Sequence, residues 1–71
     1  MNNELIVIDH RIMNGKPVIK GTRLTVQFIL GLLSRGLSFE DIKKEYNGLT
    51  NKDIEACLEF AKEAVEDLIY C

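Results

Sequence analysis

Three polar residues with side chains suited to nucleobases stand close together in the second half of the chain: Asn51, Lys52 and Glu55. Asn addresses adenine, Lys donates to guanine and Glu accepts from cytosine, so the set could contact base edges in DNA. Nearby hydroxyl and cationic groups would contact phosphates, and these are Thr50, Lys52, Lys43, Lys44 and Arg35. So few cations predict weak binding by one copy at physiological salt, which two copies would strengthen.

The sequence predicts no enzyme, no cofactor and no metal ion. His10 is the only histidine, and no Ser-His-Asp set, paired carboxylates or Cys/His ligand spacing accompanies it. Cys57 is predicted to be a small core residue and Cys71 a terminal one. Fourteen residues apart on one helix, they would lie about 21 Å from each other, too far for a disulfide.

Three helix starts with one shared pattern would position these groups. Each has a Thr or Ser preceded by leucine, with isoleucine four residues after the cap: Thr25, Ser38 and Thr50. The hydroxyl caps the first turn, and the flanking apolar pair forms a hydrophobic staple. The predicted helices span residues 26–35 and 39–46, and 51 to about 70. Their apolar faces are predicted to carry Val26, Ile29, Leu30, Leu33, Ile42, Tyr46, Ile54, Cys57, Leu58, Ala61, Ala64, Val65 and Leu68.

The fold class predicted from these elements is mainly α. Two short strands, residues 4–9 and 18–20, form an N-terminal hairpin or ribbon ahead of a three-helix bundle of helix-turn-helix type with a long third helix. The 71 residues leave no room for a second core, so we predict one domain, with residues 1–24 as the ribbon and 25–71 as the helices. The longest apolar run, 28–33, is too short to span a bilayer, which predicts a cytoplasmic protein.

Charge is divided along the chain. Residues 1–37 carry five basic and two acidic residues, whereas residues 38–71 carry four basic and nine acidic ones. The basic half would face phosphates, a partner's carboxylates or this chain's own acidic helix.

The apolar stripe of the third helix continues beyond the length that two short helices can cover. This predicts a partner or dimer interface formed by Ala61, Ala64, Val65, Leu68 and Ile69. The alternative is that the stripe folds back on the ribbon.

The string Gly15-Lys-Pro17-Val-Ile-Lys-Gly21-Thr22-Arg23-Leu-Thr-Val, followed by Ser38-Phe-Glu-Asp-Ile and Leu49-Thr-Asn-Lys-Asp-Ile, resembles domain-of-unknown-function family 433. The resemblance covers roughly residues 5–65. It implies an antitoxin of the VapB type with a homeodomain-like helix-turn-helix, and a PIN-domain ribonuclease as toxin partner. Asn14 and Asn47 replace a glycine and a proline common in the family.

Most of the string has a structural explanation. Gly15 and Gly21 suit positive-φ turns and Pro17 stiffens the entry to the second strand. Two explanations are open for Arg23. It forms a bidentate pair with a carboxylate such as Asp9 or one on the third helix, or it contacts a phosphate or a partner.

The sequence therefore supports two functions. The first is a dimeric, antitoxin-like DNA-binding protein that regulates its own operon. The second is a protein-interaction module without significant DNA affinity, which the pI of about 5.3 favours.

Overall fold

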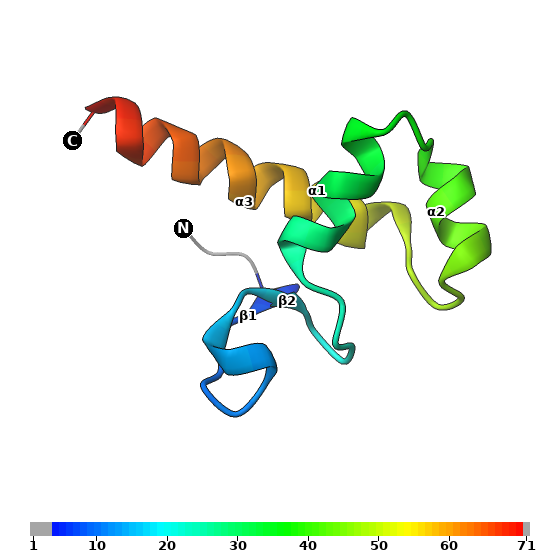
Figure 1. The fold of residues 1–71 in the computed structure, drawn as a ribbon, viewed down its shortest axis with the longest axis horizontal. Coiled ribbons are helices and arrows are strands. Elements are labelled where there is room, and N and C mark those ends of the chain that lie inside the picture. Colours follow the sequence, from blue (N-terminus) through cyan, green and yellow to red (C-terminus); the bar gives the residue numbers. More distant parts are fainter. Residues whose placement is uncertain (1–3, 71) are drawn as a thin grey trace.

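Three helices follow a short antiparallel ribbon in the computed structural model, which describes residues 4–70 and their side chains as far as Leu68 (Figure 1). The elements are β1 (Ile6–Val7), the 3-10 helix η1 (Met13–Gly15), β2 (Val18–Ile19), α1 (Val26–Ser34), α2 (Phe39–Glu45) and α3 (Asn51–Tyr70). The predicted mainly helical fold with a short N-terminal ribbon is confirmed, and α3 has its predicted length.

The strands are shorter than predicted, two residues each, and the ribbon is held from two sides. Ile6 pairs with Ile19 and Val7 with Val18 in antiparallel register. On the other side of β2, the Ile19 N–H donates to the Leu24 carbonyl at 2.9 Å. Val18 and Ile19 are each 1% exposed. Burial of these side chains therefore stabilises the ribbon more than its few hydrogen bonds between strands do.

The predicted caps are present at all three helix starts. Thr25 Oγ1 accepts from the Phe28 N–H at 3.0 Å, and Ser38 Oγ from the Asp41 N–H at 3.1 Å. Asp41 in return accepts from the Ser38 N–H at 2.9 Å, which completes a capping box. Gly36 and Gly48, at the two helix–helix connections, have φ of 94° and 97°, as expected for left-handed turn glycines.

The core lies where α1, α2, α3 and β2 meet. Its buried residues are Ile19, Val26, Ile29, Leu32, Ile42, Leu49, Ile54 and Cys57. On α1, Leu30 and Leu33 were predicted to share the inward apolar face, but they are only half-buried, and Leu32 is buried instead. Because α1 is apolar on nearly every side, its sequence alone leaves the rotation of the helix open.

Leu58 was likewise predicted to turn inward, and this is wrong: it is 42% exposed, whereas Ala56 is 7% exposed. The half-buried Phe60 packs against the core. At about 100° per residue, these positions show that the buried arc of α3 is rotated away from the predicted stripe. Tyr46 is half-buried and forms the C-cap of α2.

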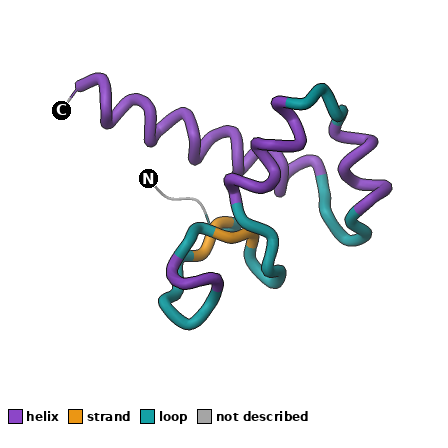
Figure 2. The backbone as a smooth tube through the Cα atoms, in the orientation of Figure 1, coloured by secondary structure: helices purple, strands orange, loops and turns teal. Residues whose placement is uncertain are grey.

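The far half of α3 extends beyond the rest of the chain. Its first half packs against α1 and β1, and the helix then runs away from both toward the C-terminal end (Figure 1). Figure 2 shows the same arrangement, with loops joining α1, α2 and α3 on the opposite side. Val65 is 51% and Leu68 79% exposed, so the stripe is not folded back on the ribbon.

Candidate functional site

The connection between α2 and α3, residues 46–50, brings the predicted DNA-contacting groups to one end of the molecule. Thr50 forms the cap of α3: its Oγ1 accepts from the Asp53 N–H at 3.2 Å. Asp53 Oδ2 accepts from the Thr50 N–H at 3.0 Å. This reciprocal pair fixes the direction in which the chain enters α3 and therefore the orientation of the residues on its first turns.

Asn51, Lys52 and Glu55, which we call the base-contact set, are all exposed on those turns. Their neighbours Ile54 and Cys57 are fully buried. The buried side therefore fixes the helix, while the polar side faces solvent.

The predicted phosphate contacts are only partly brought together. Lys43 and Lys44 are in the last turn of α2, which leads directly into the turn before α3. Lys43 Nζ lies 2.9 Å from Glu40 Oε2, so part of its charge is neutralised. Lys44 and Lys52 form no ion pair with any residue that the structure describes. Arg35 caps the C-terminus of α1 and so lies at the other end of α2 from this turn (Figure 1).

The segment from Gly15 to Val26, which carries the family resemblance, is held in place by its own polar and turn residues. Thr22 Oγ1 donates to the Ile19 carbonyl at 2.8 Å and accepts from the Leu24 N–H at 3.0 Å. Gly15 and Gly21 have φ of 83° and 80°, as predicted. The Pro17 carbonyl accepts from the Val26 N–H at 2.9 Å, which ties the ribbon to the start of α1.

The predicted Arg23–Asp9 pair is not formed. Asp9 is bound by Arg11 instead, with Arg11 Nε 3.1 Å from Oδ1 and Nη2 3.0 Å from Oδ2. This bidentate contact, together with the Arg11 backbone N–H, holds the pKa of Asp9 below its ordinary value. Arg11 is two residues from Asp9 and reaches it with little loss of chain entropy. Arg23 is exposed and forms no ion pair with any carboxylate between residues 4 and 68.

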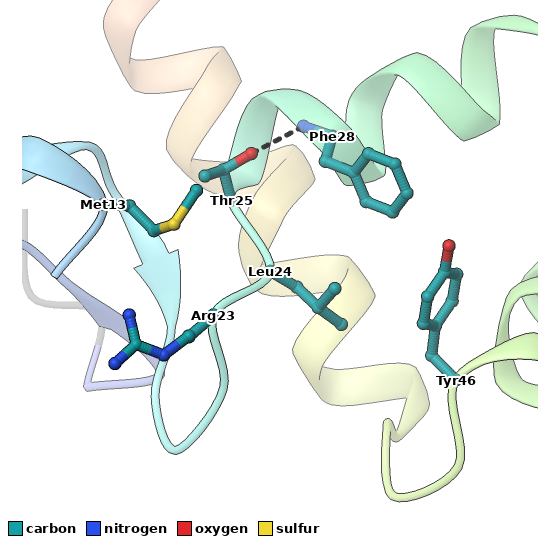
Figure 3. Close-up of a pocket in the computed structure, with 6 residues that line it drawn as sticks. All are labelled: Met13, Arg23, Leu24, Thr25, Phe28 and Tyr46. Carbon is teal, nitrogen blue, oxygen red and sulfur yellow. Dashed lines mark hydrogen bonds between the residues drawn. The ribbon is translucent and has the colours of Figure 1, made fainter.

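Arg23 borders a shallow apolar depression of about 240 Å³ between the ribbon, α1 and the end of α2 (Figure 3). The depression is lined by Met13, Arg23, Leu24, Thr25, Phe28 and Tyr46. Phe28 and Tyr46 meet edge to face, with ring centroids 5.6 Å apart. Sequence reasoning did not find this depression, because one of its aromatic residues lies on α1 and the other is the C-cap of α2, and no spacing links them.

Part of the predicted interface on α3 is exposed. Val65 and Leu68 are exposed, as is Ala64, and Ala61 is half-buried. The side chain of Ile69 and the whole of Cys71 lie outside the described residues. Leu58, which was predicted to turn inward, is exposed and extends this apolar surface toward the bundle. We call Leu58, Ala61, Val65 and Leu68 the α3 stripe.

The described residues include a buried cysteine thiol, that of Cys57. Among residues 4–70, no cluster of three His, Cys, Asp or Glu side chains is placed to hold a metal ion. Burial raises the pKa of the Cys57 thiol to about 11, with a smaller effect from Asp53. Within the same range, none of the helices is both long and apolar enough to cross a bilayer.

The family comparison matches residues 6–61 to the model described as "Protein of unknown function (DUF433)". This range holds the ribbon, α1, α2 and the first half of α3, and thus both the depression and the base-contact set. The chain belongs to the DUF433 family. The match agrees with the resemblance of residues 5–65, while the DUF433 description assigns no activity.

A DUF433 member protein from Anabaena variabilis ATCC 29413 has a similar crystal structure, with a TM-score of 0.81 and 24% sequence identity. The alignment covers 89% of this chain and 62% of that one, so the present chain spans less than two thirds of its relative's length. The likeness establishes a shared fold. A comparison with curated proteins found no significant match.

Proposed function

We propose that this DUF433 protein is an antitoxin-like DNA-binding protein of the helix-turn-helix type, which acts as a homodimer on the operator of its own operon. The observation that carries the proposal is the capped start of α3, where Thr50 and Asp53 fix an exposed turn that presents Asn51 and Lys52. In helix-turn-helix proteins, the first turns of the second helix contact base edges while flanking groups contact phosphates.

Electrostatics supports this end of the molecule as the DNA-facing one. The N–H groups that the cap leaves free at the start of a helix attract phosphate. Lys44 and Lys52 add charge and form no ion pair among residues 4–68, although the charge of Lys44 also lowers the pKa of Asp41. Glu55 is chemically matched to cytosine but repels phosphate, so it contributes specificity at some cost in affinity. Two copies would double the small number of cations.

The test is a salt-titrated binding assay with DNA from upstream of the protein's own gene. We expect Lys44→Ala to weaken binding on all sequences and to lower the slope of log K against log salt by about 1. Asn51→Ala should lose discrimination at one base pair, at a cost of about 1–3 kcal/mol. Lys20→Ala, the same change of charge on the ribbon, is the matched control. Absence of binding at low salt by the dimeric wild type would overturn the proposal.

The second candidate is a protein-interaction module, and the exposed α3 stripe favours it. In an antitoxin-like protein the partner would be a PIN-domain ribonuclease. Co-purification with the product of a neighbouring nuclease gene, combined with no operator binding, would favour this function.

A further inference from the structure

The α3 stripe has the spacing of a helix-pairing seam. Its residues Leu58, Ala61, Val65 and Leu68 follow one another at intervals of three, four and three, the pattern that keeps apolar side chains facing a partner helix. Leu58 is 42% exposed, Val65 51% and Leu68 79%. Three of the four stripe residues are therefore exposed within one copy, and Ala61 is half-buried.

The charges of α3 lie around this stripe and not on it. At about 100° per residue, Glu59, Glu63, Glu66 and Asp67 all lie more than about 100° from the centre of the stripe. Lys62 is nearer, and its Nζ is 3.7 Å from Glu59 Oε2. Two copies of the helix would thus meet through apolar side chains without bringing their acidic residues together.

We infer that two copies of this chain pair through their α3 stripes in antiparallel orientation, which places both base-contact sets on one face of the dimer. The inference rests on the proposed function and specifies the geometry of its homodimer. With the pair centred at residue 63, Leu58 faces the second copy's Leu68, and Ala61 faces its Val65. Each contact then occurs twice, as twofold symmetry requires.

The direction of pairing follows from where the base-contact set lies around the helix. Asn51, Lys52 and Glu55 lie about 60° to 160° from the stripe, all on the same side of it. In an antiparallel pair the twofold axis is perpendicular to both helices, and it leaves the two sets on the same face. In a parallel pair the axis runs along the helices and turns the sets to opposite faces, where one duplex could not reach both.

The spacing also fits DNA. Asn51 and Lys52 are twelve and eleven residues from the centre of the pair, which at 1.5 Å per residue puts the two copies of each about 33–36 Å apart. One turn of B-DNA separates half-sites by about 34–36 Å. A single duplex would therefore meet both helix starts in successive major grooves.

Cysteine cross-linking tests the orientation. In a Cys71→Ser background, one sample carries Ala61→Cys, a second carries Val65→Cys, and a third is an equimolar mixture of the two. Antiparallel pairing predicts a disulfide-linked dimer chiefly in the mixture, because these positions face each other only between different variants. Efficient cross-linking of Ala61→Cys alone would indicate parallel pairing, and no cross-linking in any sample would indicate another occupant; either result overturns the inference.

Sedimentation and footprinting complete the test. Leu68→Glu should abolish dimerisation, whereas Glu66→Lys, on the opposite side of the same turn, should preserve it. Hydroxyl-radical footprints should show two protected regions one helical turn apart, and any other spacing would overturn the predicted geometry. Cross-linking of the mixture without operator binding would overturn the proposed function alone, and operator binding without cross-linking would overturn this pairing alone.

Discussion

Thr50 and Asp53 exchange hydrogen bonds across the first turn of α3. Thr50 Oγ1 lies 3.2 Å from the Asp53 nitrogen, and Asp53 Oδ2 lies 3.0 Å from the Thr50 nitrogen. The Thr50 N–H gains an acceptor, the Asp53 N–H gains a second one beside the Thr50 carbonyl, and the start of the longest helix is fixed immediately beside the base-contact set.

Replacing the hydroxyl should destabilise the fold. Thr50→Ala is expected to lower the free energy of unfolding by about 1 kcal/mol, because the Asp53 N–H loses one of its two acceptors and keeps only the Thr50 carbonyl. Thr50→Ser keeps the oxygen and is the control. The urea midpoint measures both variants, and a Thr50→Ala midpoint equal to that of the wild type would contradict the role of this cap.

The second cap predicts a dependence of stability on pH. The backbone N–H of Ser38, and then its hydroxyl, hold the pKa of Asp41 below its ordinary value of 3.8. Since the folded state favours the charged form, the stabilisation is present above about pH 4 and is lost as the pH falls through the lowered pKa. The urea midpoints of wild type and Asp41→Asn should therefore differ most at neutral pH and converge toward pH 2. A difference that stays constant with pH would contradict this assignment.

The exposed Arg23 should matter little for stability. Because it forms no ion pair with a described carboxylate, Arg23→Gln is expected to change the free energy of unfolding by less than about 0.5 kcal/mol. Its neighbour Thr22 gives the contrast: Thr22→Val leaves the Leu24 N–H without its acceptor and should cost about 1–3 kcal/mol. A large loss of stability in Arg23→Gln would instead indicate a structural carboxylate pair.

Two adjacent residues of α1 test which of its faces is buried. Ile29 is fully buried and Leu30 only half-buried, although the sequence pattern treats them alike. Ile29→Ala should cost about 2–5 kcal/mol through lost burial and the cavity left behind. Leu30→Ala should cost less, as measured by thermal unfolding of both variants, and equal losses would contradict the observed rotation of α1.

The buried thiol should be chemically silent in the native state. Burial raises the pKa of Cys57 to about 11, so little thiolate forms at pH 8 and reagents have no access to it. In a Cys71→Ser background, a thiol reagent should modify native protein only slowly and urea-unfolded protein rapidly. Rapid modification of the native chain would show that this part of α3 is not packed as described.

The sequence by itself determined the features that depend on neighbouring residues. A cap needs a hydroxyl and an N–H three residues away, and a left-handed turn needs glycine, so Ser38, Thr50, Gly36 and Gly48 were predictable without a fold. The string that begins at Gly15, together with the motifs that begin at Ser38 and Leu49, was also enough to predict the DUF433 family, and the comparison confirmed this family.

Only the tertiary structure decided how the helices are rotated and which charged groups meet. The apolar residues of α1 and α3 outnumber the places in so small a core, and packing selected Leu32 and Ala56 for burial while leaving Leu58 outside. Arg11 binds the carboxylate of Asp9, and Arg23 is exposed beside an apolar depression. The helix rotations and the depression depend on distances between elements far apart in the chain, which no local pattern of residues specifies, whereas the Asp9–Arg11 pair joins residues only two positions apart.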